Sequence, residues 1–177
     1  TSREDRKLNM GISNIWVFSQ ESNGTATSGT LELLTHARSL GGSVTAFVGG
    51  DASAIAGILG EYGATKVYAT GDLGGALPGA AVASAMKAVI DGGDSPDLIL
   101  FPQNYEGRDV MSRLSVKVDR TVLTNNVAVA VDGDTVTVTT PVFGGNTLVS
   151  TSFSGSAPYL AAFLSLIHIS EPTRQLC

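Results

Sequence analysis

The stretch 95–120, which reads SPDLILFPQNYEGRDVMSRLSVKVDR, decides how the rest of the chain can fold. Its apolar run at 98–101 is too short for a helix and is typical of a strand buried on both faces. Pro102 ends that run, and the polar loop 103–107 follows. Apolar residues then recur on one face over 109–118, which predicts a helix. The polar loop therefore lies at the carboxyl end of a strand, where open α/β sheets bind ligands and partners.

The same stretch carries much of the positive charge. Seven Lys and Arg residues lie between Met10 and Phe163, and four of them are here: Arg108, Arg113, Lys117 and Arg120. Asp109 and Arg113 have i,i+4 spacing, which predicts an ion pair worth about 0.3 kcal/mol. A solvated helix face explains this pattern, and so does a face that docks a partner or an anion.

Arg108 stands out because it lies at the start of the predicted helix. A helix N-terminus favours the carboxylate of Asp109 and disfavours a cation by roughly a few tenths of a kcal/mol. We therefore expect Arg108 to have a partner, which is either Glu21 or Glu106 or a group on another subunit. Together with Asn104 in the preceding loop, Arg108 and Asp109 are the candidate switch-point or partner-docking residues.

Strands and helices alternate four times in the first two thirds of the chain. The expected strands are 15–18, 43–48, 66–69 and 98–101, and each precedes a helical pattern. This alternation predicts an α/β fold with a mostly parallel, Rossmann-like sheet and helices on both faces. Strand order 3-2-1-4-5 would bring the loops 19–24 and 102–107 together at the switch point.

The period changes after Arg120. Valines alternate with other residues on both sides of the turn 132–134, which predicts an antiparallel β-hairpin appended to the sheet. The stretch 147–153 is a further candidate strand. We expect one domain over 10–163, with an extraneous or disordered leader at 1–9.

Composition excludes several classes of function. The formal charge of −5 argues against nucleic acid and against an anionic membrane surface as partners. One cysteine, Cys177, excludes a disulfide framework, and the two histidines, His36 and His168, are too few for a metal cluster. No apolar run approaches about 18 residues, so we expect no membrane insertion. No apolar signal region is seen, and we expect a cytoplasmic protein.

The sequence contains no recognisable catalytic or phosphate-binding motif. The first strand is not followed by G-x-G-x-x-G, and no P-loop or G-x-S-x-G elbow is present. The glycine-rich segment 71–79 lacks the Lys-Ser/Thr that phosphate binding needs. His36 lies off the apolar stripe of its helix, so we expect it to face solvent. The residues alone therefore indicate a parallel α/β domain with no visible catalytic constellation and no metal site.

Three blocks, in this order, resemble the electron transfer flavoprotein alpha subunit. They are IWVF at 15–18 with TLELL at 30–34 and ARSLG at 37–41, GRDV at 107–110 with RL at 113–114, and TPVFGGNT at 140–147. The resemblance implies an N-terminal domain that packs against a beta subunit, a separate C-terminal domain that holds FAD, and AMP in the beta subunit. It also implies a heterodimer that shuttles electrons from flavin dehydrogenases, such as acyl-CoA dehydrogenases, to a downstream acceptor. The chain would then be part of an electron carrier and not an enzyme, with no cofactor-binding residue of its own.

The end of the chain departs from that pattern. Residues 164–177, LSLIHISEPTRQLC, resemble translated adapter sequence, and we expect an artefactual tail without FAD-binding residues. Two alternatives remain open: a stand-alone nucleotide-binding module of universal-stress-protein type, and a cofactor-free interaction subunit. A visible spectrum of the complete protein separates them, because only the flavoprotein is yellow.

Overall fold

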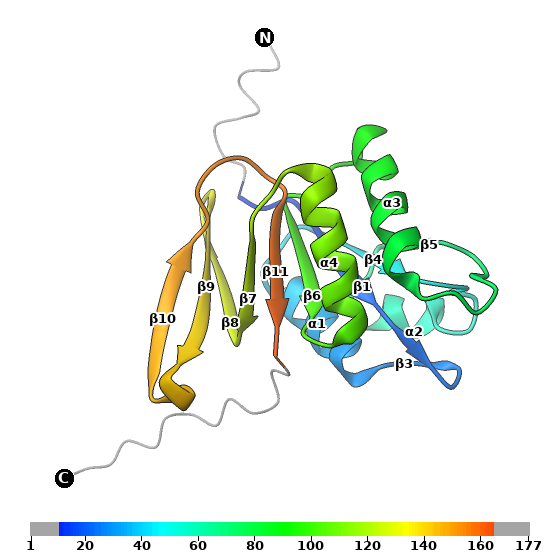
Figure 1. The fold of residues 1–177 in the computed structure, drawn as a ribbon, viewed down its shortest axis with the longest axis horizontal. Helices are drawn as coiled ribbons and strands as arrows, with labels where there is room; N and C mark the ends of the chain where they lie inside the picture. Colours follow the sequence, from blue (N-terminus) through cyan, green and yellow to red (C-terminus); the bar gives the residue numbers. More distant parts are fainter. Residues whose placement is uncertain (1–10, 165–177) are drawn as a thin grey trace.

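The computed structural model describes residues 11–164, so the expected leader 1–9 and the expected tail beyond Leu164 lie outside the described residues. Its main element is a six-stranded sheet in which every pair of neighbouring strands is parallel (Figure 1). In order across the sheet the strands are β5 (Lys66–Ala69), β4 (Ser43–Val48), β1 (Asn14–Ser19), β6 (Leu98–Pro102), β11 (Tyr159–Phe163) and β7 (Val122–Asn126). The parallel sheet confirms the predicted fold class.

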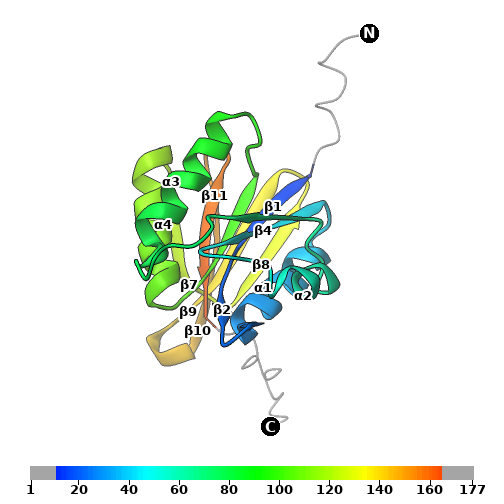
Figure 2. The ribbon, with the colours of Figure 1, turned by 90° about the vertical axis from the view of Figure 1, so that its right-hand side faces the viewer.

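Helices cover both faces of this sheet (Figure 2). They are α1 (Ser28–Ser39) and α2 (Ala56–Glu61) on one face, and α3 (Pro78–Asp91) and α4 (Tyr105–Val118) on the other. Strand β1 supplies both cores, because alternate side chains point to opposite faces. Ile15 and Val17 pack with α1 and α2, whereas Trp16 and Phe18 pack with α3 and α4. Trp16 is therefore a core residue, as its apolar surroundings in the sequence predict.

The order of the first four strands is as predicted, but the next position is not. Strand β11, close to the end of the described chain, lies between β6 and β7 and is parallel to both. The predicted order 3-2-1-4-5 is therefore wrong at its last step. The physical reason is burial: the run Tyr159–Phe163 is almost fully buried, whereas Val122–Asn126 is mostly half-exposed and suits an outer position.

A second, antiparallel sheet lies beside the β7 end of the main sheet, and we call it the wing (Figure 1). It contains β8 (Ala128–Asp132), β9 (Thr135–Val142) and β10 (Thr147–Ser152), in the order β10-β9-β8. A single 3-10 turn, η2 (Phe143–Gly145), joins β9 to β10. Val136 and Val138 of β9 are buried in the same core as α1. The predicted hairpin and the predicted strand near residue 147 are both confirmed.

Asn126 joins the wing to the main sheet. Its side chain is fully buried, and its Nδ2 donates to the carbonyl oxygens of Leu123 (2.7 Å) and Ala162 (2.9 Å). The hydroxyl of Thr140, on β9, donates to Asn126 Oδ1 at 2.9 Å. One side chain therefore bonds β7, β11 and β9 together.

Candidate functional site

The carboxyl ends of β1 and β6 form the switch point of the sheet, because β1 leads to α1 on one face and β6 leads to α4 on the other. Gln20, just after β1, bridges the two loops. It accepts a hydrogen bond from Asn104 Nδ2 (2.6 Å) and donates one from its Nε2 to Glu106 Oε2 (2.5 Å). The loops after β1 and β6 therefore meet as predicted, and Asn104 lies at the contact.

Asn104 also caps α4, which begins at Tyr105 and not at residue 109 as predicted. Its Oδ1 accepts a hydrogen bond from the backbone N–H of Gly107 at 2.8 Å, as expected for an N-cap residue. Gly107 is required here, because a Cβ at this position would collide with the carbonyl oxygen of Pro102. The earlier start moves Arg108 from the first position of the helix to the fourth.

Arg108 has no acidic partner among residues 11–164. Its guanidinium lies 5.4 Å from the centroid of the Tyr105 ring, which is a cation–π contact. The carboxylate of Glu106 accepts from Gln20, and that of Glu21 accepts from the backbone N–H of Gly24. The expected ion pair of Arg108 with Glu21 or Glu106 is therefore wrong, because each carboxylate accepts a hydrogen bond from an uncharged donor instead.

Asp109 has a structural role. Its Oδ1 accepts from Arg113 Nε at 2.7 Å, which confirms the predicted i,i+4 pair. Its carboxylate also packs against Gly79 of α3, where a Cβ would collide with it. Asp109 thus helps α3 and α4 to pack closely, and only Asn104 and Arg108 of the three candidate residues remain largely exposed.

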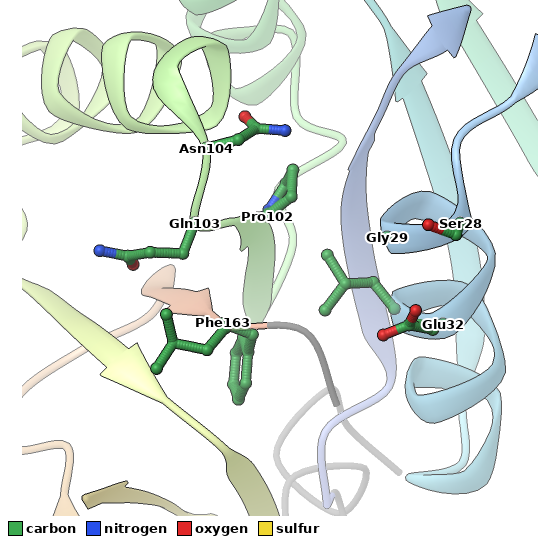
Figure 3. Close-up of a pocket in the computed structure, with 9 residues that line it drawn as sticks. Ser28, Gly29, Glu32, Pro102, Gln103, Asn104 and Phe163 are labelled. Carbon is green, nitrogen blue, oxygen red and sulfur yellow. The ribbon is translucent and has the colours of Figure 1, made fainter. Parts of the chain in front are cut away.

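A cavity of about 230 Å³ lies next to the switch point, between the start of α1 and the carboxyl ends of β6 and β11 (Figure 3). Its lining consists of Ser28, Gly29, Glu32, Leu33, Pro102, Gln103, Asn104, Phe163 and Leu164. Drug-sized ligands occupy pockets of about 300–1,000 Å³, and FAD is larger than most of them. None of the described lining residues is a Lys, Arg or His that could bind a pyrophosphate. The described lining of this cavity therefore does not fit FAD.

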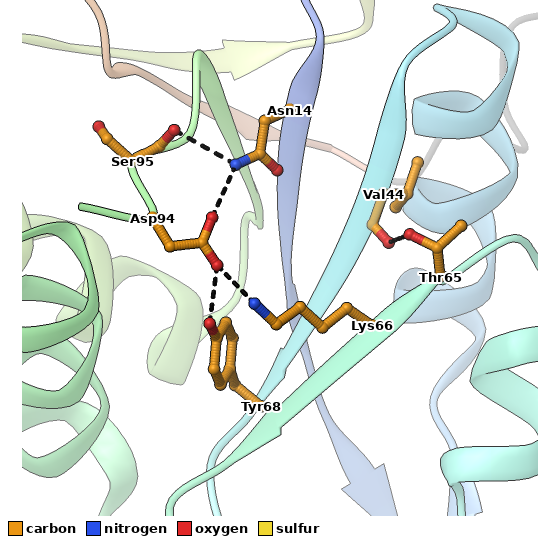
Figure 4. A network of polar contacts seen from close by, with 7 residues as sticks. All are labelled: Asn14, Val44, Thr65, Lys66, Tyr68, Asp94 and Ser95. Carbon is orange, nitrogen blue, oxygen red and sulfur yellow. Dashed lines mark hydrogen bonds and ion pairs between the residues drawn. The ribbon is translucent and has the colours of Figure 1, made fainter. Parts of the chain in front are cut away.

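The opposite edge of the sheet holds a dense polar network, which is structural (Figure 4). Asp94 accepts hydrogen bonds from Lys66 Nζ (2.6 Å), Tyr68 Oη (2.7 Å) and Asn14 Nδ2 (3.3 Å). The bonds from Lys66 and Tyr68 lower the pKa of the Asp94 carboxyl. Asp97 accepts from the backbone N–H groups of Ser13 (2.8 Å) and Asn14 (2.9 Å). These contacts hold the amino ends of β1 and β5 to the loop before β6.

His36 does not face solvent, and the prediction that it would is wrong. The imidazole is half-buried, its Nε2 is shielded from solvent, and it contacts the backbone of Val129 on β8. Burial lowers the pKa of His36, and the hydrogen bond with the Val129 backbone offsets part of that effect. The helical stripe did not reveal this contact, because the wing approaches α1 from a distant part of the sequence.

Sequence reasoning also missed a small hairpin in the loop after β1. Strands β2 (Glu21–Ser22) and β3 (Thr25–Ala26) pair around Asn23 and Gly24, which have φ values of 54° and 79°. Asn-Gly is the dipeptide that tight hairpin turns favour, so the signal was present in the sequence. The hairpin shapes the loop from which Gln20 reaches across the switch point.

The fold and the switch point together define a class of protein. It is a doubly wound α/β domain whose switch point is closed by side-chain hydrogen bonds and whose main sheet packs beside an antiparallel sheet. The sequence profile of the electron transfer flavoprotein domain matches residues 15–167. The chain is also 31% identical over 147 residues to the electron transfer flavoprotein subunit alpha of Syntrophomonas wolfei subsp. wolfei. The chain therefore belongs to the electron transfer flavoprotein family and corresponds to the N-terminal domain of its alpha subunit. This membership favours the flavoprotein interpretation over the universal-stress-protein one.

The match covers 81% of the chain and 46% of the relative, so the chain spans about half the length of the relative it matches. None of the helices in residues 11–164 is long and apolar enough to cross a membrane. The same described residues contain no group of three or more His, Cys, Asp or Glu side chains placed to hold a metal ion.

Proposed function

We propose that this chain is the structural, partner-docking domain of an electron transfer flavoprotein alpha subunit. In the complete heterodimer with a beta subunit, FAD would accept electrons from flavin dehydrogenases, such as the acyl-CoA dehydrogenases of fatty acid beta-oxidation, and pass them to a downstream acceptor. The observation that carries the proposal is the family match over most of a domain whose switch-point cavity does not fit the dinucleotide.

The proposal assigns the chemistry to the rest of the assembly. FAD would be held by the other part of the alpha subunit and AMP by the beta subunit, in the cytoplasm. FAD supplies the electron transfer, and the protein tunes and orients it. This domain would act as a carrier component and not as a catalyst. Its Asn104, Arg108 and Asp109 remain a proposed contact with partners, of which Arg108 has the most exposed charged group.

The experiment compares this chain with the complete assembly. The chain alone, purified with excess FAD and then desalted, should be colourless. The full-length alpha subunit purified with its beta subunit should be yellow and should be reduced by an acyl-CoA dehydrogenase with its substrate. Stoichiometric flavin on the chain alone would contradict the domain's assigned role, and a colourless heterodimer would contradict the proposed function as a whole.

A further inference from the structure

Strands β9 and β10 of the wing lie in a part of the sequence with no charged residue. Residues 135–164 contain no Asp, Glu, Lys, Arg or His, although the whole chain has a formal charge of −5. Burial explains this composition for β11, which lies inside the main sheet. It does not explain β10, in which five of the six residues are exposed. An exposed, uncharged surface on a charged protein requires another explanation.

Strand β10 is an unprotected edge. It pairs with β9 in an unbroken register from Thr147 to Ser152, and among residues 11–164 it has no strand on its other side. Natural edge strands carry charges, prolines or bulges that prevent pairing with another chain. Strand β10 has none of these. Its two apolar side chains, Leu148 and Val149, are 63% and 43% exposed.

The tip of the wing adds an independent observation. Phe143 in η2 is 82% exposed and has a φ of 51°, in the left-handed region that bulky residues rarely adopt. Such a conformation costs about 1–3 kcal/mol, and strained residues of this kind cluster at functional sites. Neither hydrophobic burial nor backbone preference within the described domain accounts for an aromatic residue here. A contact with a partner would account for it.

We propose that β10 and Phe143 form the docking edge for the beta subunit, which adds an uncharged β-strand beside β10 and covers the Phe143 ring. This inference rests on the proposed function and names the surface through which it operates. Strand addition uses main-chain hydrogen bonds for affinity and alternate side chains for specificity. An uncharged edge accepts an uncharged strand without leaving a buried charge unpaired.

A protein strand suits this edge better than a lipid surface does. Lipid tails offer no partners for the outward N–H and C=O groups of β10, and each unsatisfied group would cost several kcal/mol. The chain is also acidic, and it would be repelled by an anionic membrane. The relative's name identifies it as the alpha subunit of its flavoprotein, so a second type of subunit is the natural source of the strand.

The test uses two substitutions in the wing and two matched controls on α4. Val149→Lys places a charge on the open edge, and Phe143→Ala removes the exposed ring. Val116→Lys and Tyr105→Ala make the same changes at residues that are 81% and 86% exposed on α4. Each variant of the full-length alpha subunit is titrated with the beta subunit, and its thermal midpoint is measured alone.

We expect both wing variants to keep the wild-type midpoint and to bind the beta subunit at least about tenfold more weakly, a loss of about 1.4 kcal/mol. The α4 controls should bind within about twofold of wild type, which is under about 0.5 kcal/mol. Amide hydrogen exchange in β10 should slow when the complex forms, which a side-chain contact alone would not cause.

Three results would overturn the inference while leaving the proposed function intact. They are a wild-type complex that the wing variants leave unchanged, a loss of affinity in the α4 variants only, and self-association of the alpha subunit that Val149→Lys abolishes. The last would assign the edge to a second copy of this chain. A wild-type alpha subunit that does not bind the beta subunit at all would instead contradict the proposed function.

Discussion

The parallel sheet and the wing are stabilised in different ways. In the parallel part, exposed charged groups are paired with one another, as Asp94 is with Lys66 beside the sheet and Asp109 is with Arg113 on α4. The wing has apolar residues on its inner side and uncharged exposed residues on its outer strand. The two regions therefore differ in how their exposed residues interact: the charged groups of the parallel part are paired within the chain, whereas the exposed residues of β10 carry no charge.

Leucine truncation should separate the two regions most strongly. Leu100→Ala in β6 removes a fully buried side chain and should lower the free energy of unfolding by about 2–5 kcal/mol. Leu148→Ala in β10 removes a mostly exposed one and should change it by less than about 0.5 kcal/mol. Urea unfolding of the 177-residue chain measures both. A similar loss at the two positions would mean that β10 is packed within this chain.

Removing the side chain of Asn126, whose hydrogen bonds join the parallel sheet to the wing, should have the next largest effect. Asn126→Ala deletes the three hydrogen bonds of a fully buried side chain, so we expect a loss of about 2–3 kcal/mol. Thr140→Val removes only the bond from β9 and should cost about 1 kcal/mol. The double variant should lose no more than Asn126→Ala alone, because both changes remove the same contact. Additive losses would show that the two side chains act separately.

Acid should weaken the contact between α1 and the wing. Because burial lowers the pKa of His36 in the folded state, the unfolded chain binds a proton more readily. Stability is therefore complete above the ordinary histidine pKa of 6.5 and falls as the pH drops through that value towards the folded pKa. One proton limits the slope to about 1.4 kcal/mol per pH unit.

The control for this pH dependence is the other histidine of the chain. His36→Gln should flatten the stability profile between roughly pH 5 and pH 7.5, a window in which carboxylates remain ionised. His168 lies outside the described residues, and His168→Gln is measured in parallel so that the slope can be assigned to one of the two histidines. A profile that depends on His168 and not on His36 would contradict the assigned burial.

Arginine substitutions on α4 should have the smallest effect on stability. Arg108→Ala should change the free energy of unfolding by less than about 0.5 kcal/mol, because its contact is a surface one with Tyr105. Arg113→Ala should cost about 0.3–0.5 kcal/mol through the lost pair with Asp109. Thermal unfolding of both variants tests this. A weaker complex of Arg108→Ala with the beta subunit, at unchanged stability, would move the docking surface from the wing to the switch point.

Much of the parallel part could be predicted, because its signals are local. The boundaries of Ser43–Val48 and Lys66–Ala69 were predicted as observed, and Pro78 begins α3 as its fixed backbone angle favours. The start of α4 was placed four residues late, since Asn104 and Gly107 read as loop residues until their capping bond is seen. An N-cap followed by a glycine resembles an ordinary turn in sequence.

What could not be predicted depends on contacts between distant residues. The site of insertion of β11, the contact of His36 with β8 and the three bonds of Asn126 all join segments that are far apart in the chain. The hydrophobic pattern of a short stretch of sequence cannot reveal such contacts. The partner predicted for Arg108 was wrong for the same reason, because Gln20 reaches Glu106 from across the switch point.

The position of β11 has a consequence for how the chain is made. Strands β1, β4, β5 and β6 are all synthesised before residue 103 and can pair with one another at once. Strand β7 comes next but finds its main-sheet neighbour only after Phe163 has been added, because β11 must enter between β6 and β7. During translation the growing domain therefore exposes the β6 edge while the whole uncharged segment emerges. Such edges invite wrong pairing, so the domain is most vulnerable to it before its last strand has been made.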